Sequence, residues 1–578
     1  MKRCFLLLTI AVTLIPFTVK SQKFERTSPD FELTKSKGQP RSTLININNI
    51  SMWIRNDGWS ARNPHTGNGG VIFPQGTGTL IFQDGIVWAG LIKDSRQPIL
   101  RAGGQTYGIG TLEGRIISKG VAEDPNDPDV RIWRIRRDWK TANLRQDAAE
   151  LNNISVEQVT EAQIAEVREQ YERDWNKWPW EKGAPFYDDN DNGIMDPGEE
   201  PGLAHADQVI WFVANDLSVS ATKGSFGSLP IGLEFQGTLW AYKKPDPLEN
   251  AIFKRYRLIY KGTETTPDTA HIDSMYIGQW SDPDVGSYSD DLVGTDTLLA
   301  LGYAYNSAAM DQEYSRFALI PPAMGYNLLR GPLDAHSEPL GMTSFVSIAP
   351  FFGDPCLICD RSAEHYNLLR GFPRDSDPQN PEPHRDPNGN PTKFMFSGDP
   401  VTGSGWLDGH SRPPGDRRFV MGSGPFTMAL GDTQEVIIAV VAGLGANRLF
   451  SVQVMKHHAK WARQLALANF ELPPESEPEP EKPPLPTRFR LSQNFPNPFN
   501  PGTKIRYELP EARHVNLSIY NVLGQNFKTL VDEVKAAGSY SVTWDGTDER
   551  GQPVPSGVYF YRFDAEIVSG TKKMILMR

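Results

Sequence analysis

The chain has 578 residues, of which 39% are hydrophobic and 22% are charged, and its formal net charge is −11. This length exceeds the roughly 250–300 residues at which a single core stops growing, so several domains are expected. An acidic chain lacks the basic face that nucleic-acid binding requires, which argues against a nucleic-acid partner. The 51 glycines and 46 prolines favour a mainly β fold with many turns.

The first 21 residues have the pattern of a secretory signal peptide. Lys2 and Arg3 form a positive start, an apolar run follows over residues 5–19, and Val19 and Ser21 suit a cleavage site. The alternative is a short membrane anchor, but the apolar run falls short of the ~20 residues that a bilayer span needs. No later segment is long and apolar enough, so no transmembrane span is expected after signal removal.

Residues 22–471 are expected to form a β-rich body, largely a β-sandwich with a few helices. Short apolar runs alternate with Gly- and Asn-rich turns from residue 40, and longer strand patterns follow from Asp207. Helices are expected after the capping box of Thr160 and Gln163 and over residues 449–470. Residues 354–418, rich in Asp, Pro and Gly, are expected to form long ordered loops. The body either folds as one unit or divides into two subdomains near residue 203.

The stretch DDNDNGIMDPGE has the spacing of an EF-hand calcium loop, D-x-N-x-N-G-x5-E. Calcium prefers six to eight oxygen ligands, and this spacing makes side-chain oxygens converge around a turn at Gly193. Prolines after the loop prevent a regular exit helix, so we expect an isolated loop that binds a structural Ca²⁺. A solvated Asp/Asn/Gly turn is the alternative. The predicted ligands are Asp188, Asn190, Asn192, Ile194 through its carbonyl, Asp196 and Glu199.

A second acidic stretch, SDPDVGSYSDD, matches no metal-binding template. Its acidic residues either gather around another cation or form a plain turn. The four carboxylates concerned are those of Asp282, Asp284, Asp290 and Asp291.

Two cysteines, Cys356 and Cys359, remain after signal removal. Outside the cytoplasm, a local disulfide is the favoured state of such a closely spaced pair. A zinc site would need two more ligands, and His365 and His384 are irregularly placed for it.

The end of the chain is expected to be a separate unit. Residues 472–487 are rich in Pro and Glu and are expected to form a semi-rigid linker. Residues 488–578 alternate apolar and polar positions between Gly-rich turns, which predicts a small C-terminal Ig-like β-sandwich.

The motifs NFPNPFNP, KIRYELP, IYNVLGQ, GSYSVTWDG, SGVYFYR and KKMILMR occur in this order within residues 488–578. They resemble the C-terminal sorting domain of type IX secretion cargo and are also similar to the Ig-like domain of flagellar hook-capping proteins. The resemblance implies export through the periplasm, recognition of residues 488–578 by the outer-membrane type IX machinery, and release or attachment at the cell surface. An accessory Ig-like domain without a sorting role is the alternative.

The body also resembles a loosely defined set of large secreted proteins that carry the same tail, through text such as DWNKWPW and ADQVIWFVANDL. That resemblance implies no activity. Motifs of the G-x-S-x-G, H-E-x-x-H and phosphate-loop types are absent from the sequence. We therefore expect a secreted or cell-surface protein whose calcium-stabilised body binds an extracellular polymer or surface. A secreted hydrolase of polysaccharide or protein with an unidentified carboxylate pair is the alternative.

Overall fold

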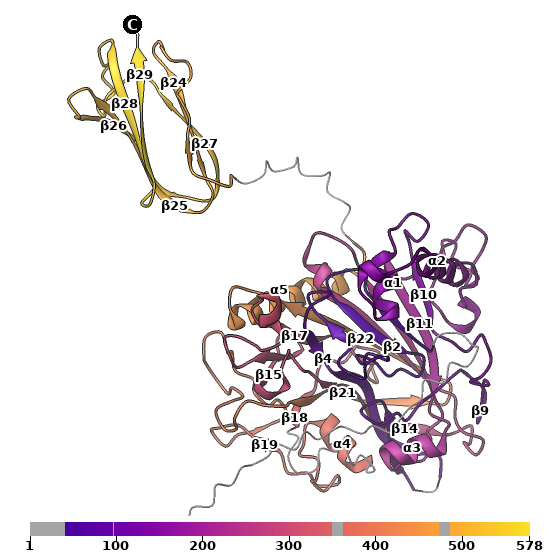
Figure 1. The fold of residues 1–578 in the computed structure, drawn as a ribbon. Coiled ribbons are helices and arrows are strands. Elements are labelled where there is room, and N and C mark those ends of the chain that lie inside the picture. Colours follow the sequence, from indigo (N-terminus) through magenta and orange to yellow (C-terminus); the bar gives the residue numbers. More distant parts are fainter. Residues whose placement is uncertain (1–40, 96, 349–361, 473–485) are drawn as a thin grey trace, which may run out of the picture. The chain divides into compact units, whose positions relative to one another are not determined.

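The computed structural model describes residues 41–95, 97–348, 362–472 and 486–578. The predicted signal peptide at residues 1–21, Cys356 and Cys359 lie outside the described residues. The chain divides into two units, one ending at Leu472 and one beginning at Pro473 (Figure 1). Both are built mainly from strands, which confirms the expected fold class.

The body contains a nine-stranded antiparallel sheet and a five-stranded antiparallel sheet. The nine-stranded sheet has the order β10 (Trp133–Arg136), β11 (Gln208–Asn215), β12 (Leu233–Ala241), β13 (Ala251–Tyr260), β22 (Thr433–Gly443), β17 (Ala323–Arg330), β16 (Leu301–Asn306) and β15 (Asp291–Asp296), with β7 (Leu112–Glu113) paired to β11. The five-stranded sheet has the order β18 (Ser344–Ile348), β21 (Arg418–Ala429), β14 (His271–Asp282), β5 (Gln83–Lys93) and β6 (Ile99–Gly104).

Smaller sheets complete the body. They are the four-stranded sheet of β1 (Ser42–Ile45), β2 (Ser51–Arg55), β3 (Val71–Ile72) and β4 (Thr79–Ile81), and the pairs β8 (Ile116–Ser118) with β9 (Val121–Ala122) and β19 (His384–Arg385) with β20 (Pro391–Thr392).

The two large sheets pack against each other and enclose the main core. In β13, Ile252 and Tyr256 lie in this core, whereas Phe253 lies in the core on the opposite face of the sheet. Strand β5 contributes Ile86 and Trp88 from the other sheet. Each such side chain contributes roughly 1.5–3 kcal/mol when fully buried. Because central strands are covered on both faces, alternate apolar residues of β11 and β22 lie in the two different cores.

The sequence around residue 203 does not separate two sheets. Strands β10 and β11 lie on opposite sides of that position, yet they pair in the same sheet, with Trp133 opposite Trp211. The whole body up to Leu472 forms one compact unit. The subdomain boundary considered from sequence therefore falls inside a continuous sheet.

Helices cover the outer faces of both sheets (Figure 1). Helix α5 (Arg448–Leu467) begins where the Asn447 side chain accepts hydrogen bonds from two backbone N–H groups, and it packs Val452 and Met455 on the nine-stranded sheet. Helix α4 (Ser362–Arg370) packs on the five-stranded sheet and lies within a region expected to be loops. Helix α3 (Val219–Phe226) lies beside β6.

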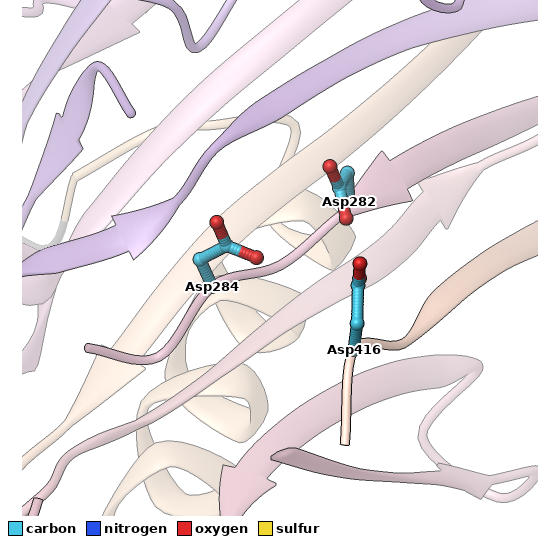
Figure 2. Close-up of side chains that lie close together, drawn as sticks. All are labelled: Asp282, Asp284 and Asp416. Carbon is cyan, nitrogen blue, oxygen red and sulfur yellow. The ribbon is translucent and has the colours of Figure 1, made fainter. Parts of the chain in front are cut away.

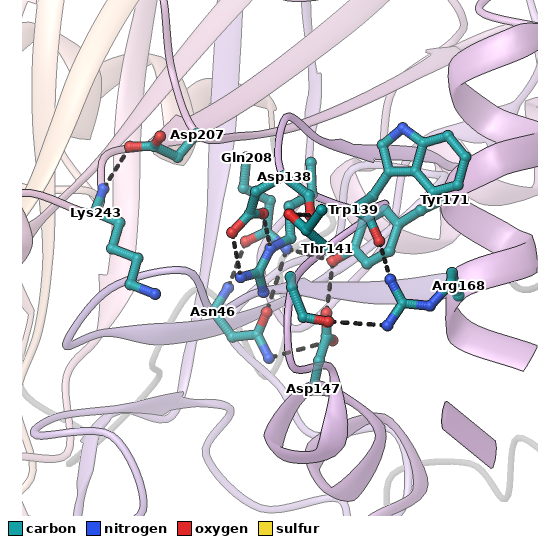
Figure 3. Close-up of polar contacts among 12 residues, drawn as sticks. Asn46, Asp138, Trp139, Thr141, Asp147, Arg168, Tyr171, Asp207, Gln208 and Lys243 are labelled. Atoms are coloured by element: carbon teal, nitrogen blue, oxygen red, sulfur yellow. Dashed lines mark hydrogen bonds and ion pairs between the residues drawn. The ribbon is translucent and has the colours of Figure 1, made fainter. Parts of the chain in front are cut away.

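A buried polar network attaches two further helices, α1 (Arg145–Asn152) and α2 (Glu161–Asn176), to the edge of the nine-stranded sheet (Figure 3). Arg134 in β10 donates to Asp147 in α1 at 2.6 Å, and Tyr171 in α2 donates to the other oxygen of Asp147 at 2.6 Å. Burial opposes the charge of Arg134, but Asp147 raises the pKa of the guanidinium, so Arg134 remains charged. The expected capping box of Thr160 and Gln163 starts α2.

The C-terminal unit is a two-sheet sandwich. One sheet contains β23 (Arg490–Leu491), β24 (Thr503–Leu509) and β27 (Gly538–Trp544), and the other contains β26 (Asn526–Lys535), β25 (Arg513–Asn521), β28 (Gly557–Asp564) and β29 (Ser569–Leu576). As the alternation predicts, Val515, Leu517 and Ile519 all lie in its core, as do Tyr561 and Phe563.

Candidate functional site

The predicted calcium loop projects from a short antiparallel stem between α2 and β11. Tyr187 N–H donates to the Glu200 carbonyl at 3.0 Å, and Gly202 N–H donates to the Pro185 carbonyl at 3.1 Å. The Tyr187 ring stacks on His205 at 4.8 Å between centroids. The stem therefore fixes both ends of residues 188–199 on the body without flanking helices, as the prolines predict.

The first half of the loop turns around the Asp188 carboxylate. Its two oxygens accept hydrogen bonds from the backbone N–H groups of Asn192 at 3.0 Å and Gly193 at 2.7 Å. Gly193 has φ of 74°, in the left-handed region that favours glycine. Ile194 N–H donates to Asn192 Oδ1 at 2.7 Å, while the Ile194 side chain is exposed. This sharp turn brings the first four predicted ligands close together.

Glu199 closes the second half of the loop. Its two oxygens accept hydrogen bonds from the backbone N–H groups of Asp189 at 2.9 Å and Asp196 at 2.8 Å. Asp196 Oδ2 in turn accepts from the side-chain amides of Asn190 at 2.9 Å and Asn192 at 2.8 Å. All six predicted ligand positions therefore belong to one closed loop.

The chemistry of this loop suits a hard cation. Residues 188–199 contain five acidic residues and no basic residue. Rotating the amides of Asn190 and Asn192 by half a turn would direct their oxygens, in place of their nitrogens, towards the position beside Asp196. Hydrogen bonds from these two amides already lower the pKa of Asp196, so its carboxylate is charged at neutral pH. The residues present thus fit Ca²⁺.

The structure brings together only some of the carboxylates of the second acidic stretch. Asp282 ends β14, and its carboxylate lies with those of Asp284 and Asp416 in a group whose ligand oxygens are all within 4.8 Å of one another (Figure 2). Asp290 instead accepts a hydrogen bond from Asn306 at 3.1 Å. Sequence reasoning missed Asp416 because it lies far along the chain, just before β21, in no recognisable motif.

A hollow of about 230 Å³ lies between the end of α5 and the nine-stranded sheet. Trp240 and Phe470 line it together with one carboxylate, that of Glu435. Arg255 and Arg330 lie 3.9 Å and 3.6 Å from the Glu435 carboxylate. A glycoside hydrolase requires two carboxyl groups across the scissile bond, so this hollow does not supply that arrangement.

No helix in the described ranges combines the length and apolarity needed to cross a bilayer.

The C-terminal unit has a recognisable relative. Residues 497–569 match the FlgD Ig-like domain, and this range runs from the segment before β24 into β29. The C-terminal unit is an Ig-like domain. Its two packed sheets and its continuous core agree with that assignment. No curated protein matches the chain in sequence.

Three solved structures resemble parts of the chain. FlgD from P. aeruginosa is 28% identical over 13% of this chain and 57% of its own length, with a TM-score of 0.11. PorZ, from the type IX secretion system of Porphyromonas gingivalis, is 12% identical over 68% of this chain and 47% of its own, with a TM-score of 0.13. A polysaccharide lyase is 6% identical over 59% of this chain and 34% of its own length, with a TM-score of 0.17. Scores of this size assign neither fold nor activity to the body.

Proposed function

We propose that this protein is exported by type IX secretion and acts at the cell surface or in the medium. Residues 488–578 are its sorting domain, and the body is a calcium-stabilised binding or structural module. The observation that carries this proposal is the Ig-like domain at the C-terminus, which follows a Pro/Glu-rich stretch and bears the ordered tail motifs. The signal-peptide pattern at residues 1–21 supports the same route.

A sorting domain must be recognised without help from its cargo. The tail, residues 488–578, has its own closed core, and the chain divides between Leu472 and Pro473, so the tail can fold without the body. Within the NFPNPF motif, Phe499 is 2% exposed and fills the core, whereas Phe495 is 80% exposed. An exposed phenylalanine adds nothing to a core, and we assign Phe495 to contact with the export machinery.

Two features support a binding or structural role for the body. The acidic loop at residues 188–199 stands on a fixed stem, where a bound cation would offset its clustered charge. The hollow beside α5 holds a single carboxylate that two arginines approach. This hollow lacks the two carboxyl groups that glycoside hydrolysis requires, and we therefore favour binding over hydrolysis there.

The test is localisation in a bacterium that has a type IX system. The full chain should reach the surface or medium, and a chain lacking residues 488–578 should accumulate, folded, in the periplasm. Fusing residues 488–578 to a signal peptide and a reporter protein should export the reporter. Normal export of the truncated chain would refute the sorting role.

A matched pair of variants separates recognition from folding. Phe495→Ala should block export of the reporter without changing the melting temperature of the tail, because Phe495 is exposed. Phe499→Ala should lower the melting temperature, because it opens a cavity in the core. If Phe495→Ala were exported at the normal level, this side chain would have no part in recognition.

A further inference from the structure

We propose that Asp282, Asp284 and Asp416, with the buried Asp291 beside them, form a second, buried site for one divalent cation, calcium by its ligand chemistry, where the ends of β14, β15 and β21 meet. This site is separate from the loop at residues 188–199 and does not depend on the sorting role of the tail. No spacing pattern in the sequence predicts this site, because its carboxylates come from three different strands and the segments next to them.

The geometry of three of these carboxylates suits one ion. Ligand oxygens of Asp282, Asp284 and Asp416 lie within 4.8 Å of one another (Figure 2). Two oxygens that each lie 2.3–2.6 Å from a calcium ion are at most about 5 Å apart, so a single ion can contact all three. Acidic clusters on a surface commonly spread into water, but Asp282 and Asp284 are buried.

The surrounding strands hold the cluster in place. Ser281, next to Asp282, pairs with Phe419 of β21, and Asp282 itself pairs with Gln83 of β5. Asp416 stands two residues before β21 and is carried by the same strand. Ligands on paired strands keep their positions without the ion, which favours binding at low entropic cost.

Asp291 is the independent observation that points to a ligand. It is fully buried at the start of β15. Its Oδ2 accepts a hydrogen bond from Val285 N–H at 3.4 Å, and its carbonyl accepts one from Gly415 N–H at 3.1 Å. The carboxylate thus faces the turn that bears Asp284, and the backbone adjoins the residue before Asp416.

The other oxygen of Asp291, Oδ1, is buried without a hydrogen-bond partner among the described residues. A buried carboxylate oxygen needs a proton donor or a cation. The carboxylates of Asp284, Asp290 and Asp416 also lie near enough to Asp291 to repel a negative charge on it. A divalent cation would supply the missing interaction and offset the repulsion between these neighbours.

Two neighbouring side chains orient the cluster. Arg418 Nη2 lies 3.1 Å from Asp416 Oδ2, and Arg418 Nε lies 3.6 Å from Asp282 Oδ1. The Tyr107 hydroxyl also donates to Asp282. Carboxylates that bind metals are commonly held by such outer hydrogen bonds, which fix the direction of the remaining oxygens.

The first test counts calcium ions. The purified full chain is stripped with a chelator, dialysed against calcium chloride in the millimolar range, and analysed for bound calcium per chain by atomic emission. The loop variant Asp188→Asn/Glu199→Gln should retain one ion, and the cluster variant Asp284→Asn/Asp416→Asn should lose one ion relative to the unmodified chain. A loop variant that binds no calcium would overturn the buried site, as would a cluster variant that binds as many ions as the unmodified chain.

These variants also separate the two proposed metal sites. If the loop at residues 188–199 binds no calcium, the unmodified chain and the loop variant will both bind one ion. The loop variant changes only side chains at a projecting loop, so its ion count remains informative even if substitutions in the buried cluster impair folding.

The second test is thermal. In chelator, Asp284→Asn should melt no lower than the unmodified chain, because it removes a like charge from the cluster. With calcium, it should show a smaller upward shift of the melting temperature, because a ligand is lost. If the variant melts lower by the same amount with and without calcium, the cluster is a hydrogen-bonded structural feature and the proposal fails.

Discussion

The ammonium of Lys254 in β13 lies 2.9 Å from the carboxylate of Asp84 in β5, and both side chains are fully buried. The pair connects the two large sheets inside the sandwich. The Tyr326 hydroxyl donates to Asp84 at 2.7 Å, and Ser60 donates to its other oxygen. Burial opposes the charge on Lys254, but Asp84 raises the pKa of the ammonium, so Lys254 remains charged.

Lys254→Met should therefore be strongly destabilising. The substitution leaves Asp84 buried without its counter-ion, and breaking a buried pair in this way costs about 3–5 kcal/mol. The free energy of unfolding from urea titration measures the effect. Lys243→Met, at an exposed lysine, is the matched control and should change stability by less than about 0.5 kcal/mol. Equal effects of the two substitutions would show that the buried pair does not stabilise the sandwich.

Asp216 should make the body less stable as the pH rises from 4 to 7. It is buried and accepts hydrogen bonds from Ile231, Gly232 and Leu233 N–H, yet burial raises its pKa from 3.8 to about 6. Because the folded pKa exceeds the unfolded one, its contribution is complete below about pH 4 and is lost as the pH rises through 6. Two pKa units correspond to about 3 kcal/mol.

Asp216→Asn removes the titrating group and isolates this effect. Unfolding free energies of the two proteins should be measured at intervals across the same pH range. The stability of the unmodified protein relative to the variant should fall by about 3 kcal/mol from pH 4 to pH 7. A relative stability that stays constant or rises with pH would contradict the raised pKa.

Glu199→Gln should remove the part of the calcium-dependent stability that comes from the loop. Extracellular calcium sites bind at about 10⁻⁴–10⁻³ M, so ten millimolar calcium should stabilise the body by about 1.4–2.7 kcal/mol through this site. Asp189→Asn changes the same charge at a loop position outside the ligand pattern, and it should keep the full effect. Melting curves with calcium and with chelator give both values. If calcium shifted the melting temperature of the two variants equally, residues 188–199 would be an ordinary turn that binds no cation.

Tyr561→Phe should loosen the start of the tail. The Tyr561 hydroxyl donates to the Ser492 carbonyl at 2.7 Å and accepts from Asn494 N–H at 2.9 Å, which holds the segment before β24 on β28. Losing both bonds should cost about 1–3 kcal/mol of tail stability. Tyr520→Phe, at a half-buried tyrosine of the same sheet, is the control. Hydrogen exchange at residues 492–494 should accelerate in the first variant only.

Local patterns in the sequence predicted the fold best where one face of an element is buried. The tail strands alternate cleanly, and Val515, Leu517 and Ile519 accordingly lie together in one core. The capping box and apolar spacing likewise placed α2. Helix α4 was missed because its nine residues lie between Asp- and Pro-rich segments that predict loops.

Local sequence patterns could not predict the contacts between segments that lie far apart in the chain. Lys254 lies in a strand that is covered on both faces, so alternation could not show that it meets Asp84. Likewise, the acidic composition drew attention to the stretch at Asp282 but could not include Asp416, which the pairing of β14 with β21 brings to it. The EF-hand-like loop could be predicted from the sequence because all its candidate ligands lie within twelve residues.

The order of strands has a consequence for how the body is made. Strand β22 pairs with both β13 and β17, and β21 pairs with both β14 and β18, so the last two strands of the body occupy interior positions in different sheets. During translation, the earlier strands leave the ribosome with these central neighbours missing. The five-stranded sheet cannot close until residue 429 has been synthesised, and the nine-stranded sheet cannot close until residue 443. The nascent body therefore cannot complete its fold until nearly all of it has been synthesised, because the strands at the centre of both sheets come last.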